Sequence, residues 1–184
     1  VAVTGGLEVA SDRLLAKMDK GVTVEQVTQV AAAFRASGVM VHAYLMYGFP
    51  TETDQETIDS MELVRQMFAE GVLASAFWHR FVLTRHSGIY PMPEQFGVRI
   101  LDTGKVHFAQ NDVGHADPAG GNHDAFDDVL PVALAAWMRG EDLSRPVHTW
   151  FSGAKMPKTR ERSSRIREAL LGAPEPDGGR VVWL

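Results

Sequence analysis

Two short segments of this 184-residue chain combine glycine, carboxylate and aromatic residues in a pattern that suits ligand binding. They are Gly5-Gly6-Leu7-Glu8 and Tyr47-Gly48-Phe49-Pro50-Thr51-Glu52-Thr53. Glycine lets a ligand approach the backbone, Phe49 offers a flat apolar surface, and Pro50 fixes the turn. This combination suits a planar heterocycle with a polar tail. The alternative is that both segments are only turns and helix caps, and these residues alone leave the two interpretations open.

The apolar pattern predicts three strands, over residues 1–4, 39–47 and 74–82. The middle strand contains no turn residues, which is typical of a strand covered on both faces in a parallel sheet. The first strand starts as if it were entered midway. We therefore expect the chain to be a C-terminal fragment or a processed form of a longer protein.

Helix-start signals separate these strands. Ser11 precedes an acidic first turn, and capping boxes follow at Thr23 with Gln26 and at Thr53 with Glu56. Strands and helices that alternate through short loops predict right-handed βαβ crossovers and a parallel sheet. Ligands of such folds bind at the carboxyl ends of the strands, so we expect both glycine segments at one rim.

The composition excludes several kinds of site. The chain has no cysteine, which excludes a disulfide framework, a thiolate zinc site, a cysteine nucleophile and a cysteine-ligated cluster within it. Eighteen basic and twenty-three acidic residues give a net charge of -5, so no global positive field attracts nucleic acid or an anionic membrane. Neither a membrane-spanning stretch nor a secretory signal is present, so we expect a cytoplasmic protein.

The two glycine segments resemble motifs of the radical S-adenosylmethionine (SAM) enzymes. GLEVASDRLLAKMDKGVTVE, residues 6–25, resembles the GLESGSDRVLKLMNKG.T.E segment of the methylthiotransferases, the coproporphyrinogen dehydrogenases and the cobalamin-associated branch. YGFPTET, residues 47–53, looks like their GFPGET segment at the expected distance downstream. Val9-Ala10 replaces Ser-Gly, and Thr51 replaces the second glycine of GFPGET. The resemblance covers roughly residues 5–85.

The resemblance implies an α/β fold: the C-terminal half of a partial (β/α)6 TIM-like barrel, with the three strands as strands four to six. Residues 1–90 would form this barrel half, and residues 91–184 a mixed, mostly helical C-terminal extension of unknown role. In the family, SAM and a [4Fe–4S] cluster share the carboxyl rim, and a CxxxCxxC loop after the first strand holds the cluster. An electron from the cluster cleaves SAM to a 5′-deoxyadenosyl radical, which abstracts hydrogen from the substrate.

The full-length protein is therefore expected to be a radical SAM iron–sulfur enzyme, whose missing N-terminal half carries the cluster ligands and is the partner of this chain. Cobalamin is left open as a further cofactor, and the small-molecule substrate is unknown. Alone, the chain is expected to be inactive, because one-electron cleavage of SAM needs the cluster. The alternative is a non-catalytic binding or regulatory module that associates with a partner or with itself through open sheet edges.

Carried over residue by residue, the resemblance assigns cofactor contacts to both segments. Glu8 would be a polar contact at the ribose or methionyl end of SAM. Gly48, Phe49 and Pro50 would line the adenine side. Glu52 belongs to the same motif as a SAM-binding candidate, or it orients the loop and is stabilised by the following helix N-terminus.

Three strand residues are candidates for substrate contact. His42 and Tyr44 alternate with Ala43 and Leu45, so both can point into the barrel. The alternative for this pair is two satisfied polar groups in the core. His79, Arg80 and Phe81 on the third strand could approach the nucleobase or the substrate, and Arg80 is the one assigned to substrate contact. No residue is assigned as catalytic.

A group of metal-ligand residue types in the extension is expected to be solvated loop. Its spacing matches no compact metal signature, so we predict no metal site. Its members are His107, His115, Asp117, His123 and Asp124.

The rest of the extension gives weaker signals. Residues 84–124 are predicted to form a long irregular segment with short strands near 98–101 and 106–109. Residues 124–139 predict a buried helix in which Pro131 occupies the first turn or causes a kink. Residues 158–171 predict a basic amphipathic helix with little aromatic interleaving, so we do not expect nucleic-acid binding.

Overall fold

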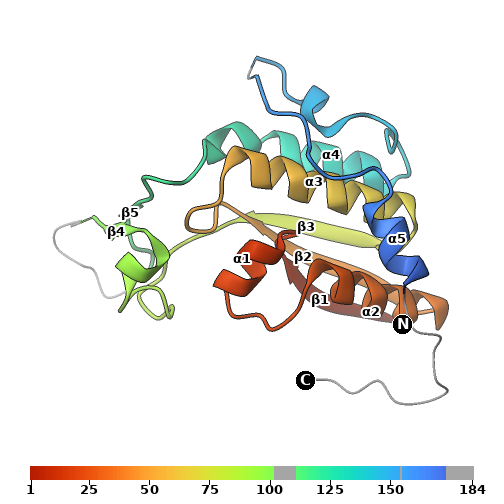
Figure 1. Cartoon of the computed structure of the whole chain (residues 1–184), viewed down its shortest axis with the longest axis horizontal. Helices are drawn as coiled ribbons and strands as arrows, with labels where there is room; N and C mark the ends of the chain where they lie inside the picture. Colours follow the sequence, from red (N-terminus) through yellow and green to blue (C-terminus); the bar gives the residue numbers. More distant parts are fainter. Residues whose placement is uncertain (102–110, 154, 173–184) are drawn as a thin grey trace.

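The computed structural model of the chain describes residues 1–101, 111–153 and 155–172. Its centre is a three-stranded parallel sheet in which the strands are hydrogen-bonded in chain order, without reversal (Figure 1). The strands are β1 (Ala2–Glu8), β2 (Met40–Tyr47) and β3 (Ser75–Arg80). The predicted parallel α/β arrangement is therefore confirmed, and the described residues close no barrel.

The connections between the strands contain three helices: α1 (Asp12–Lys17), α2 (Val24–Ala36) and α3 (Asp54–Ala69). The predicted start signals are confirmed, because the Ser11 hydroxyl accepts from the α1 backbone and both capping boxes are formed. Parallel crossovers are right-handed in nearly all proteins. Two crossovers that advance in the same direction therefore put their helices on the same face of the sheet.

The alternation of buried residues shows which face the helices cover. Side chains at every second position are buried beneath them, whereas Met40, Tyr44 and Phe77 on the opposite face are 53%, 47% and 55% exposed. The sequence predicted cover on both faces of β2, and within the described ranges only one face has it. The physical reason is that the later segments pack onto the helices. The buried set on the strands is Leu7, Val41, Ala43, Leu45, Tyr47, Ala76 and Trp78.

The segment after β3 begins with short elements. An antiparallel pair joins β4 (Arg99–Ile100) to β5 (His115–Ala116), which confirms the strand predicted near 98–101. The strand predicted near 106–109 lies outside the described residues.

Helix α4 (Val129–Met138) lies beside α3 and β3 (Figure 1). Pro131 occupies the first turn of α4, as predicted, where its missing N–H leaves no hydrogen bond unmade. Phe126, Leu130 and Trp137 are buried in the same core as the residues of the β–α unit. No helix in the described ranges has the length and apolarity that crossing a bilayer requires.

The helix predicted over residues 158–171 is wrong in its first half, because α5 spans only Arg165–Leu171. The residues before it cross helix α3 and bond to its side chains through their backbone. Asp59 Oδ1 accepts the N–H of Arg160 at 2.7 Å, and Gln66 donates to the carbonyl of Arg162 at 2.9 Å. These contacts hold the non-helical segment before α5 against α3.

Candidate functional site

Both glycine segments lie at the carboxyl edge of the sheet. β1 ends at Glu8, whose register partner on β2 is Leu45, and residues 48–53 follow the end of β2 directly. Because β1 and β2 are parallel neighbours, both segments leave the sheet at the same edge. The prediction that the segments around Glu8 and Phe49 share one rim is therefore confirmed.

Glu8 occupies an unusual backbone conformation at this rim. Its φ is +57°, and the β1–β2 register shifts between Gly6 and Glu8. The side chain folds over Gly6, where an added Cβ would lie 2.5 Å from Glu8 Oε1. The carboxylate pairs with Lys20 Nζ at 3.0 Å. The end of β1 therefore presents one negative and one positive group side by side.

The loop after β2 contains two residues with left-handed backbone. Gly48 has φ +77°, which glycine adopts without steric cost. Thr51 has φ +71°, a strained conformation for a β-branched residue. In the family segment that this loop resembles, glycine stands at the position of Thr51. Thr51 therefore adopts a turn conformation that glycine adopts more readily.

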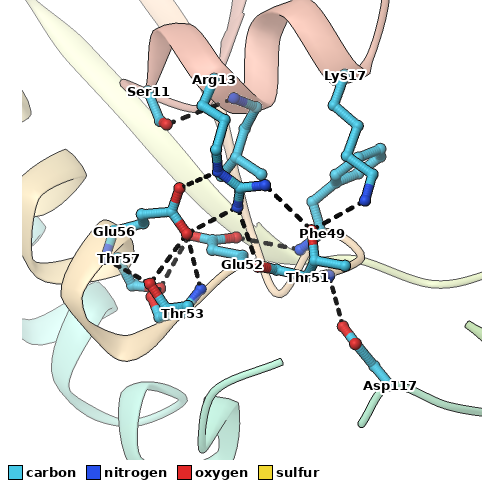
Figure 2. Close-up of polar contacts among 11 residues, drawn as sticks. Ser11, Arg13, Lys17, Phe49, Thr51, Glu52, Thr53, Glu56, Thr57 and Asp117 are labelled. Atoms are coloured by element: carbon cyan, nitrogen blue, oxygen red, sulfur yellow. Dashed lines mark hydrogen bonds and ion pairs between the residues drawn. The ribbon is translucent and has the colours of Figure 1, made fainter. Parts of the chain in front are cut away.

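Three charged side chains converge on Thr51 and hold this turn (Figure 2). Arg13 donates to the Thr51 carbonyl at 3.0 Å, and Lys17 donates to the Thr51 hydroxyl at 2.9 Å. Asp117 accepts the Thr51 N–H at 2.6 Å. Every polar atom of Thr51 is thus bonded, and the strained conformation is fixed from three directions.

Arg13 also binds Glu56 in the first turn of α3, with both carboxylate oxygens as acceptors (Figure 2). Burial acts to raise the pKa of Glu56, but the hydrogen bonds from Arg13 and Thr53 outweigh it, so the pKa is lowered. A paired carboxylate near a helix N-terminus is also favoured by the helix dipole. Arg13 therefore joins the helix after the first segment to the loop and helix of the second.

Glu52 lies wholly inside the loop, with 0% of its surface exposed. Its Oε2 accepts the N–H of Phe49 at 3.1 Å, and its Oε1 accepts the Thr57 hydroxyl at 2.8 Å. Burial raises the pKa of Glu52 to about 7, although these hydrogen bonds act to lower it. Of the two roles that the sequence left open, these contacts are those of loop orientation.

Phe49 and Pro50 are buried beneath the loop. The Phe49 ring meets Phe81 and Phe96 edge-on, with centroids 5.3 Å and 6.3 Å apart. In this structure both residues support the rim from below, and Gly48 is the part of the expected adenine side that reaches the surface.

His42 and Tyr44 share the open face of the sheet. His42 Nδ1 lies 2.7 Å from Ser75 Oγ, and the His42 and Tyr44 rings meet edge-on at 5.3 Å. Both side chains therefore lie on the face of the sheet that the helices leave open.

Arg80 lies on the other face, with Trp78, and pairs with Asp124 at 2.6 Å and Asp127 at 3.1 Å. The structure thus separates Arg80 from the other two substrate candidates. His79 holds the open-face position instead. His79 and Arg80 were named together from the sequence, and the alternation of side chains about a buried Trp78 is the signal that distinguishes them.

The extension contributes a wall to this rim through residues 117–123. Besides the Asp117 contact with the loop, Gly121 N donates to the carbonyl of Glu52 at 2.8 Å. The His123 ring lies 3.4 Å from the point where a Cβ on Gly48 would be. The sequence analysis named Asp117 and His123 only as members of a loop cluster and assigned them no role.

Within the described ranges, no three His, Asp or Glu side chains converge as a metal site would require, and His107 lies outside these ranges. No protein-family model and no curated protein matches the chain. The two segments and their geometry are therefore the features of the chain that indicate a function.

Asp117→Asn tests the contact that holds Thr51. An amide has one acceptor oxygen, whereas the carboxylate accepts from Thr51 on one oxygen and from the turn amides of Ala119 and Gly120 on the other. We expect a loss of about 1–2 kcal/mol in the free energy of unfolding, measured by urea denaturation. Asp128→Asn is the control and should change it by less than about 0.5 kcal/mol. Equal effects of the two variants would contradict this account of the loop.

Glu52→Gln tests the buried carboxylate. The pKa of Glu52 is raised in the folded state, so its contribution to stability is fully present below pH 4.5 and is lost as the pH rises to about 7. The loss is on the order of 3 kcal/mol. Glutamine can accept from Phe49 and donate to Thr57, so urea unfolding of the variant should lose this pH dependence. Glu94→Gln, at an exposed site, should keep it; a wild-type slope in Glu52→Gln would refute the assignment.

Proposed function

We propose that the chain is part of a radical SAM enzyme and supplies half of a partial (β/α)6 barrel whose carboxyl rim binds SAM. The strand order supports this proposal, because strands in chain order with helices on one face are the arrangement of a singly wound barrel. A doubly wound sheet would reverse its order and cover both faces. The open face would be the barrel interior, and the N-terminal half of the protein would complete it.

The observation that carries the proposal is the position of the two motif-like segments. They are about forty residues apart in sequence and lie next to each other on parallel strands at one edge. Arg13 and Lys17, which follow the first segment, bond directly to Thr51 in the second. A shared nucleoside pocket requires this neighbourhood, whereas unrelated turns do not.

The charged groups at the end of β1 fit the methionyl end of SAM. That end carries an α-ammonium and an α-carboxylate, and Glu8 and Lys20 offer the two opposite charges 3.0 Å apart. The backbone at Gly48, which is partly exposed and bordered by the His123 ring, suits the adenosyl part. Phe49 and Glu52 act as positioning residues, since they hold the loop and are themselves buried.

The cluster chemistry would come from the other half of the protein. A [4Fe–4S] cluster supplies the electron that cleaves SAM, and its cysteine ligands must lie outside a chain that has none. The residues of this chain bind and orient SAM and line the space above the sheet. A CxxxCxxC motif in the coding sequence within roughly 150 residues before Val1, about half a barrel, would support the enzyme. Its absence would support a binding module.

The open face also favours this second candidate function. Half-exposed Met40, Tyr44 and Phe77, together with the unpaired outer edges of β1 and β3 in the described part of the chain, form a surface on which copies can associate. Sedimentation velocity over a hundredfold concentration range separates the candidates. A self-associating module should show a dimer that Phe77→Lys dissociates, whereas a monomer at all concentrations contradicts it.

Gly6→Ala tests the SAM site. A Cβ at this position meets the Glu8 carboxylate, so the variant should displace Glu8 without unfolding the strand. Gly5→Ala is the matched control, because no atom lies within 4 Å of its added Cβ. Calorimetric titration with SAM should show binding that weakens at least tenfold in Gly6→Ala and is unchanged in Gly5→Ala. Absent binding in the parent chain, or equal affinity in both variants, would contradict the proposed site.

A further inference from the structure

The open face carries a continuous floor of rings. Tyr44 on β2 and Phe77 on β3 are register partners, so their side chains are neighbours on this face. The His42 ring meets the Tyr44 ring edge-on, and His79 follows Phe77 by two residues on the same side of β3. Aromatic groups this exposed and this close together form a surface that gains from being covered by another ring.

This floor carries no Lys, Arg, Asp or Glu at the described strand positions before the rim. A charged group placed over it would lose hydration without gaining a counter-ion, which is costly. The chemistry of the face therefore favours an uncharged occupant. The positions are Ala2, Thr4, Gly6, Met40, His42, Tyr44, Met46, Ser75, Phe77 and His79.

Polar atoms at the margin of the floor add a second preference. His42 uses Nδ1 in its contact with Ser75 Oγ, which leaves Nε2 for another partner. The Tyr44 hydroxyl is a neutral donor and acceptor on a half-exposed side chain. These groups suit an occupant whose ring edge can form hydrogen bonds.

The floor is continuous with the rim. Gly6 is the β1 register partner of Tyr44, so no side chain separates the ring from β1 at this point. The Glu8 carboxylate lies over Gly6 and pairs with Lys20, so the charged pair borders the floor. A molecule on the floor would therefore lie next to the site assigned to the methionyl end of SAM.

We propose that the open face binds an uncharged aromatic ring system with a hydrogen-bonding edge. This ring system is the main part of the substrate molecule. The identification of the occupant as substrate rests on the proposed function. The preference for an uncharged ring rests on the composition and register of the face alone.

The test uses the chain and N-phenyl-1-naphthylamine, an uncharged aromatic probe whose fluorescence rises in apolar surroundings. We expect saturable binding that weakens at least tenfold in Phe77→Ala and Tyr44→Ala and stays within about threefold in Phe77→Tyr. Val132→Ala, which removes a 60% exposed side chain on α4, is the matched control and should leave the affinity unchanged. Circular dichroism confirms that each variant is folded. Equal affinity in the parent chain and Phe77→Ala would overturn the inference.

Two further arms identify the occupant. 1-Anilinonaphthalene-8-sulfonate has similar rings with a negative charge and should bind at least fivefold more weakly; equal or tighter binding would overturn the preference for an uncharged ligand. Sedimentation in the same buffer detects a second copy on the face, and a dimer that excludes the probe would overturn the ligand site. SAM binding without probe binding defeats this inference alone, whereas probe binding without SAM binding defeats the proposed function and, with it, the assignment as substrate.

Discussion

The hydrogen bonds from Arg13 to Thr51 and Glu56 are the interaction on which the rest of the site depends. They join the helix that follows β1 to the loop that follows β2, so two segments distant in sequence become one surface. Thr51 is held in a conformation that threonine rarely adopts, and Asp117 from the extension completes its hydrogen bonds. Such strain persists only where the surroundings determine it fully. The extension is thus part of what shapes the rim.

The second constraint is that the described residues cover the sheet on one side. A parallel sheet normally buries both faces, because the helices of its crossovers cover them and its strands are apolar on both sides. Here strand order without reversal sends the crossovers to a single side. The bare side has rings in its middle and charges at its carboxyl end. The middle of this face therefore suits an apolar part of a ligand, and its carboxyl end suits an ionic group.

Local signals were the part of this structure that the sequence could predict. Thr23 and Thr53 start helices as capping boxes, since each bond joins residues three apart. The position of Phe49 was not predictable in this way, because its ring partners come from the distant segments that follow β3. The face on which Arg80 lies was also not predictable locally, since the face of a strand depends on which alternate residue packs against helices. The contacts that the extension makes with the rim could likewise not be predicted from local sequence patterns.

The central claim is that the rim segments of β1 and β2 form one SAM site. Titration of the ¹⁵N-labelled chain with SAM, followed by amide chemical shifts, tests it most directly. The account predicts that Gly6, Glu8 and Gly48 shift together and give a single dissociation constant, while amides of α4 stay in place. Shifts confined to one segment, or spread over α4 and α5 with neither segment affected, would contradict it.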